Sequence, residues 1–155
     1  MIKSLIVFLL SFVGIFIIDQ NIKTIFLEGY RWYGDYFSLI LTYNKGVAFS
    51  MLSFLDGNLK YLQFILLLGV VIYLAMNKEI FKRYTIPASM ILASGSSNLY
   101  DRFIHGGVVD YFYWHKWFDF AVFNFADVMI NISVVIILIL SFKNSKIADP
   151  TPPCF

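Results

Sequence analysis

The sequence predicts an all-α membrane bundle with four transmembrane helices, and two observations predict it: composition and hydropathy pattern. Of the 155 residues, 59% are hydrophobic and 14% are charged, and the mean hydropathy is +0.73. Ordinary soluble domains carry about 25% charged residues, so this composition excludes that class. Four charge-free runs follow one another along the chain: Ser4 to Ile18, Tyr61 to Asn77, Tyr84 to Tyr100 and Val128 to Phe142.

Each run is short for a membrane-spanning helix, which needs about 17 to 25 residues, so every helix must extend into its polar flanks. Lys3, Lys60 and Lys143 can reach the membrane surface from such flanks. No small-residue cleavage site follows the first run, so we expect a retained helix and not a removed signal peptide. We expect a single membrane-embedded domain at 1–147 and a disordered tail at 148–155 with the sole cysteine, Cys154. The expected helices lie at about 4–20, 60–77, 84–102 and 127–143, and the outer segments at 24–59 and 103–126.

The distribution of charge predicts that both termini lie in the cytoplasm. Lys and Arg accumulate on the cytoplasmic side of membrane proteins, and three of them crowd the short turn from Asn77 to Arg83. In this orientation the inner segments have a net charge of +4 and the outer segments a net charge of −2. No basic stripe is present, so nucleic acid is not an expected partner, whereas membrane lipid is.

The polar groups before the second helix each have two interpretations. Asp19 and Lys23 are four residues apart, so they predict either a salt bridge that anchors the helix end or a functional pair. Farther on, Asp35 to Tyr43 alternates loosely and is rich in β-favouring residues, which predicts a strand. Asn44 and Gly46 then indicate either a hairpin turn with positive φ at the glycine, or a site where Asn44 pairs with a substrate backbone.

The second and third helices differ in their polar residues. The second contains a single polar side chain near its outer end, Gln63, and we expect this helix to be scaffold. The third has small residues from Ala93 to Ser97, which let neighbouring helices approach closely. Asn98 and Arg102 share one helical face at a depth where polar groups face the protein interior or a cavity and serve function. Asp101 points elsewhere on the helix and is expected to pair with a neighbouring cation.

Two carboxylates on the outer side carry the expected chemistry. Asp110 follows two glycines, and Asp127 begins the last helix. Asn124 is a good N-cap for that helix, so Asp127 has a purely structural interpretation as an acid in the first turn. The alternative is a catalytic pair, because two close carboxylates cannot easily both ionise, and one then holds a proton while the other acts as a base. That division suits hydrolysis of a peptide by water. His105 and His115 lack metal-ligand spacing, and no cofactor or metal is expected.

Five motifs follow one another along most of the chain. They are Asp19-Gln-x-x-Lys23, Asn44-x-Gly46-x-Ala48-Phe49, Asn98-x-x-Asp-Arg102, Val108-Val-Asp110 and Phe123-Asn-x-Ala-Asp127. In this order they resemble the motifs of the bacterial lipoprotein signal peptidases (signal peptidase II). The resemblance implies that the catalytic aspartates are Asp110 and Asp127. It implies that the substrate-binding residues are Asp19, Lys23, Asn44, Gly46, Asn98, Arg102 and Asn124, which favours the functional interpretation of the first three.

The resemblance also implies a fold and an activity. The fold is a four-helix bundle with a small extracytoplasmic β-structured platform and a mobile flap. The activity is that of an aspartic endopeptidase that removes the signal peptide from diacylglyceryl-modified prolipoproteins, just before the lipidated cysteine. It acts at the outer face of the bacterial cytoplasmic (inner) membrane. A monomer and inhibition by globomycin-type compounds are expected from the family.

One departure from the family's pattern is visible in the third helix. The family usually has glycines where this chain has Ser97 and Ala93-Ser94, and we expect the small size of these residues to preserve the packing. Two alternatives come from other functional classes. A small lipid or ion transporter would also place acids at helix ends, and a non-catalytic assembly factor would need no paired acids.

Overall fold

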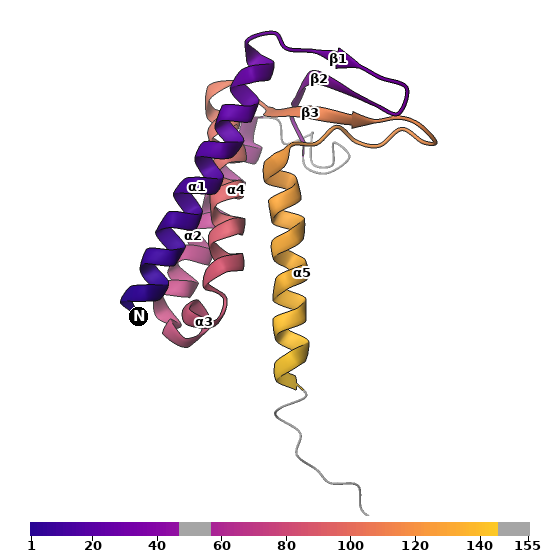
Figure 1. Cartoon of the computed structure of the whole chain (residues 1–155). Helices are drawn as coiled ribbons and strands as arrows, with labels where there is room; N and C mark the ends of the chain where they lie inside the picture. The colour runs from indigo at the N-terminus through magenta and orange to yellow at the C-terminus, as the bar shows by residue number, and fades with distance from the viewer. Residues whose placement is uncertain (47–56, 146–155) are drawn as a thin grey trace, which may run out of the picture.

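The computed structural model describes residues 1–46 and 57–145, and within them five helices and three strands (Figure 1). The helices are α1 (Ile2–Leu27), α2 (Leu59–Met76), α3 (Lys78–Arg83), α4 (Thr85–Ile104) and α5 (Phe125–Ser145). The strands are β1 (Trp32–Tyr33), β2 (Phe37–Asn44) and β3 (Val108–Trp114). The sheet lies at one end of the long helices (Figure 1). Ala48 and Phe49 of the second motif, and the tail with Cys154, lie outside the described residues.

Across the described residues, three helices are long and apolar enough to cross a membrane: Ile2–Leu27, Leu59–Met76 and Phe125–Lys143. Large apolar side chains cover their outward faces, and Leu10, Leu66 and Ile139 are 70%, 62% and 60% exposed. α4 is equally long but less apolar, because serines, an asparagine and two charged residues occupy its outer half. The prediction of a mostly helical membrane protein is confirmed, whereas a fourth helix with the composition of a membrane span is not.

The end of α1 differs most from its predicted position. The charge-free run predicts an end near residue 20, but the helix continues to Leu27. Asp19, Lys23 and Phe26 are the buried residues of α1, and all three lie in its last three turns. The polar residues beyond the apolar run therefore form a packing face and do not end the helix.

α4 occupies the middle of the bundle and contacts α1, α2, α3, α5 and β3. Its small residues make these contacts possible: Ala93, Ser94 and Ser97 are fully buried. At Gly95, an added Cβ would lie 2.7 Å from a methyl carbon of Leu67 on α2, so a larger residue would require that leucine side chain to move. The prediction that the small residues serve close packing is confirmed.

The sheet is antiparallel in the order β1-β2-β3, and it brings the second and fourth motifs together. The predicted strand from Asp35 to Tyr43 is confirmed as β2, but β3 falls in a stretch predicted only as an aromatic outer segment. Thr42 pairs with Asp110, and Asn44 pairs with Val108. Because residues two apart share a face of a strand, Asn44 and Asp110 are diagonal neighbours on one face of the sheet.

Candidate active site

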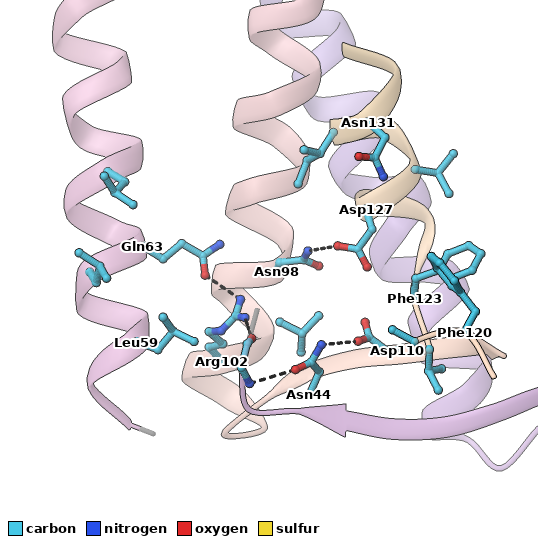
Figure 2. Close-up of a pocket in the computed structure, with 18 of the residues that line it drawn as sticks. Asn44, Leu59, Gln63, Asn98, Arg102, Asp110, Phe120, Phe123, Asp127 and Asn131 are labelled. Atoms are coloured by element: carbon cyan, nitrogen blue, oxygen red, sulfur yellow. Dashed lines mark hydrogen bonds between the residues drawn. The ribbon is translucent and has the colours of Figure 1, made fainter. Parts of the chain in front are cut away.

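A cavity of about 880 Å³ lies between α2, α4, α5 and the sheet, and it contains the expected catalytic residues. Asp110 and Asp127 both line it, and Figure 2 shows their carboxylates on the same side of the cavity. The other expected site residues that line it are Asn44, Gly46, Asn98 and Arg102. The remaining wall is mostly apolar, from α2 and α5 and from the segment 120–123. The structure therefore joins residues from four motifs at one polar region of an otherwise apolar cavity.

Asp110 is held by two amides. Asn44 Nδ2 donates to one carboxylate oxygen at 3.0 Å, and Asn124 Nδ2 donates to the other at 2.7 Å. The side chain is only 1% exposed. Burial, reinforced by the negative charge of Asp127, raises the pKa of Asp110 from its ordinary value of 3.8 to about 7, against the opposing effect of the two amide hydrogen bonds. Asp110 therefore holds its proton at neutral pH far more readily than an exposed aspartate does.

Asp127 lies in the first turn of α5, where the helix start and the cavity meet. Its backbone N–H donates to Asn124 Oδ1 at 3.0 Å, and the Asn124 backbone N–H donates to the Asp127 carboxylate at 3.1 Å. This reciprocal arrangement is a capping box, so the structural interpretation of both residues is correct. It does not exclude a chemical role, because the second carboxylate oxygen accepts from Asn98 Nδ2 at 3.0 Å and faces the cavity (Figure 2).

Asn124 links the two acids, although it does not line the cavity. It caps α5 and also donates from Nδ2 to Asp110, to Asn98 Oδ1 at 3.1 Å and to the Val109 carbonyl at 3.3 Å. The side chain is 1% exposed. The relative position of the aspartates is thus set by one buried amide that bonds to both.

Tyr111 and Asp19 fix the start of α5 from two other elements. The Phe125 N–H donates to the Tyr111 hydroxyl at 3.0 Å, and the Ala126 N–H donates to Asp19 Oδ1 at 2.9 Å. Tyr111 in turn stacks on Phe26 of α1, with ring centroids 4.2 Å apart. Sequence reasoning missed Tyr111, because nothing in the sequence distinguishes it from the other aromatic residues of that segment.

A buried ion cluster lies behind the cavity wall. Lys23 Nζ lies 2.6 Å from a carboxylate oxygen of Asp19 and 2.7 Å from one of Asp101, and it donates to Asn98 Oδ1 at 2.8 Å. Ser97 Oγ donates to Asp19 at 2.6 Å. The prediction that Asp101 pairs with a neighbouring cation is confirmed. Asp19 and Lys23 do not line the cavity, and at 0% and 1% exposure they contact Asn98 and α5 from behind.

Arg102 connects α4 to both α2 and the outer segment. Its Nη1 donates to Gln63 Oε1 at 2.7 Å, and its Nη2 donates to the Gly46 carbonyl (Figure 2). Gln63 uses its other end to donate to the Gly95 carbonyl at 2.8 Å. Gly46 N–H donates to Asn44 Oδ1 at 2.9 Å, as in a turn. The expectation that α2 is only scaffold is therefore wrong, and the signal was Gln63, an amide in an otherwise apolar stretch of that helix.

Among the described residues, no group of three or more His, Cys, Asp or Glu side chains could hold a metal ion. His115 instead shares a hydrogen bond with Ser38 at 2.9 Å. The chemistry available in the cavity is that of two carboxylates with their amides and a guanidinium.

Comparison with known proteins identifies the family. Residues 11–143 match the model of the family described as signal peptidase (SPase) II. A lipoprotein signal peptidase of Sulfurimonas denitrificans is 58% identical over 92% of each chain. One of Campylobacter jejuni is 55% identical over 90% of each chain. This chain belongs to the lipoprotein signal peptidase family, signal peptidase II. The protein is therefore a signal peptidase, which is a protease, and it is a membrane protein.

The fold of this signal peptidase also matches a solved structure. A bacterial membrane enzyme solved by the in meso method superimposes with a TM-score of 0.78, covering 95% of this chain and 94% of the other. The two sequences are 24% identical, so the likeness supports the fold alone.

Proposed function

We propose that this signal peptidase is an aspartic endopeptidase that cleaves diacylglyceryl-modified prolipoproteins just before the lipidated cysteine, with Asp110 and Asp127 as the catalytic pair. One observation carries the proposal: Asn124 bonds to both carboxylates, and both line one cavity. Dependence on two acids is what separates this function from a transporter or an assembly factor.

The two aspartates divide the work according to their surroundings. Asp110 is the more buried of the two acids and its pKa is raised to about 7, so in this proposal it holds the proton. Asp127 lies at a helix N-terminus, which favours its anion, and acts as the base that takes a proton from water. The water attacks the scissile carbonyl while protonated Asp110 donates a hydrogen bond to the carbonyl oxygen as charge develops there. No covalent intermediate forms.

The other expected site residues have two kinds of role in this proposal. Asn44, Gly46, Asn98 and Arg102 line the cavity and hold the extended peptide. Asp19, Lys23 and Asn124 lie behind the wall and keep Asn98, Asp110 and the start of α5 in place. Positioning within less than an ångström matters, because misplacement of that size can cost about a hundredfold in rate.

We further propose that α4 crosses the membrane as a fourth helix, shielded from lipid by its neighbours. The enzyme is a monomer in the bacterial cytoplasmic (inner) membrane, with both termini in the cytoplasm and the cavity near the outer face. The cavity also accepts globomycin-type inhibitors, because they would occupy the same peptide-binding wall.

Replacement of each aspartate tests the function. Purified Asp110→Asn and Asp127→Asn variants should lose at least about a hundredfold in turnover of a lipidated prolipoprotein, the range for loss of acid–base catalysis, while they still fold and bind substrate. Asp119→Asn is the matched control, because Asp119 is an exposed acid bonded to Tyr113 outside the cavity. Near wild-type cleavage by either folded variant, or a trapped acyl-enzyme, would contradict the proposal.

A further inference from the structure

Asn131 is an amide in the cavity that the five motifs do not include. It lies on α5 four residues after Asp127, so it shares that face of the helix one turn farther from the sheet. Figure 2 shows it beside the cavity beyond Asp127, and it belongs to the lining. Because α5 runs from the sheet end into its apolar stretch, Asn131 lies farther along that stretch than Asp127.

The lining residues next to Asn131 are apolar and provide no hydrogen-bond partner for its side-chain amide. The neighbouring lining residues of α5 are Val128, Ile130 and Ile132, and α2 faces them with leucines. Within residues 1–46 and 57–145 the Asn131 side chain makes no hydrogen bond. Ser133 on the same helix differs, because its hydroxyl donates to the Ile130 carbonyl at 2.6 Å and is fully buried.

An unpaired amide at this depth points to a ligand. Polar groups within a membrane span are costly, face a cavity or the protein interior, and mark substrate paths. Every other amide side chain that lines this cavity already donates a hydrogen bond within the protein: Asn44 and Asn98 donate to the aspartates, and Gln63 donates to the Gly95 carbonyl. Asn131 alone of these, among the described residues, makes no side-chain hydrogen bond, and its side chain is exposed at the cavity lining.

We propose that Asn131 is a specificity-determining residue that donates a hydrogen bond to a carbonyl oxygen of the bound substrate on the membrane side of the scissile bond. This inference rests on the proposed function. Four residues of helix rise about 6 Å, and an extended chain advances about 3.3 Å per residue, so the carbonyl lies about two residues from the bond that is cut. A peptide carbonyl of the signal peptide and an ester carbonyl of the diacylglyceryl group both meet this description.

The test compares KM with kcat for Asn131→Leu, which keeps the approximate volume and removes the donors. Loss of one hydrogen bond to substrate should raise KM for a lipidated prolipoprotein about threefold to tenfold and leave kcat within about twofold. Val135→Leu is the control, because Val135 lies on the same helix outside the cavity lining and is exposed. Asn131→Ala serves as a second variant should the leucine disturb the fold.

A second substrate identifies the source of the carbonyl. A dialkylglyceryl (ether-linked) prolipoprotein lacks the ester carbonyls but keeps the peptide. If the increase in KM disappears with this substrate, the bond is to the ester; if it persists, the bond is to the peptide. Wild-type KM for both substrates in a folded, active Asn131→Leu enzyme overturns the inference. That result is distinct from failure of the proposed function, which would appear as cleavage that survives loss of Asp110 or Asp127.

Discussion

At the scale of single residues, Asn124 is the residue that forms hydrogen bonds with both aspartates. It bonds to Asp110 through its side chain and to Asp127 through both its backbone and its side chain. A change at any group that touches either acid should therefore be visible in the pH dependence of the reaction. Asn44 is the most useful of these groups, because it touches only Asp110 of the two.

We predict an alkaline loss of activity near pH 7. Asp110, with a pKa raised to about 7 in the free enzyme, keeps its proton below that pH and releases it above, so kcat/KM should fall about tenfold per pH unit on the alkaline side. The Asn44 hydrogen bond lowers this pKa, so Asn44→Leu should move the alkaline limb to higher pH. Tyr43→Phe is the control on the neighbouring position of β2. A limb that stays fixed or moves to lower pH in Asn44→Leu would refute the assignment of the proton to Asp110.

A second residue-scale prediction concerns Gln63. Gln63→Met removes the acceptor for Arg102 and should lower kcat/KM about tenfold, equivalent to about 1.4 kcal/mol of transition-state stabilisation. Gln63→Glu keeps that acceptor and should retain most of the activity. Phe64→Leu changes a lipid-facing neighbour and serves as the control. Equal losses in the Met and Glu variants would assign the effect to the Gly95 contact and not to Arg102.

At the scale of elements, α4 holds the bundle together through buried serines with different partners. Ser94 and Ser97 are both fully buried, three residues apart on the same helix. Ser97 Oγ donates to the Asp19 carboxylate and accepts from Gln20, whereas Ser94 Oγ has no hydrogen-bond partner among the described residues. The same substitution at these two positions should therefore have different effects.

We predict that Ser97→Ala lowers the free energy of unfolding by about 1.5 to 3 kcal/mol, because it removes a hydrogen bond to a buried charge. Ser94→Ala should be neutral or slightly stabilising, since it removes a hydroxyl that is already unpaired. Denaturant unfolding of both variants in the same detergent measures the difference. Similar values for the two would show that the hydroxyl of Ser97 does not support the ion cluster.

At the scale of the whole molecule, the two ends of the described chain lie at the end of the bundle away from the sheet. α1 starts there and α5 runs towards it, whereas the aspartates lie near the sheet (Figure 1). Three basic residues, Lys78, Lys82 and Arg83, belong to α3, which also lies at that end. This arrangement agrees with the predicted orientation, in which that end faces the cytoplasm.

Thiol labelling tests this orientation. In a Cys154→Ser background, Asn58→Cys at the start of α2 should react with an impermeant reagent in intact cells, because Asn58 is exposed at the sheet end. Lys82→Cys in α3 should react only after permeabilisation. The reverse pattern would place the active site on the cytoplasmic side.

The sequence by itself determined the class of the protein and predicted most of the polar residues that line the cavity. Its hydrophobic composition makes a soluble fold untenable, and the expected helices at 60–77 and 127–143 match α2 and α5 to within two residues. The capping role of Asn124 follows from local rules, since its partner Asp127 is only three residues away. Local periodicity likewise indicated β2. Each of these predictions depends on interactions between residues near one another in the chain.

The tertiary structure decided what depends on distant contacts. β3 forms because β2, about seventy residues earlier, supplies its hydrogen-bond partners. The length of α1 depends on the ion pair between Lys23 and Asp101. Gln63 is important because it accepts a hydrogen bond from Arg102, 39 residues later in the chain. Such contacts leave no periodic signal, because the free energy that fixes them comes from burial and pairing after the helices assemble. Only the assembled fold therefore shows that Asp19 and Lys23 lie behind the cavity and that Asn131 opens into it.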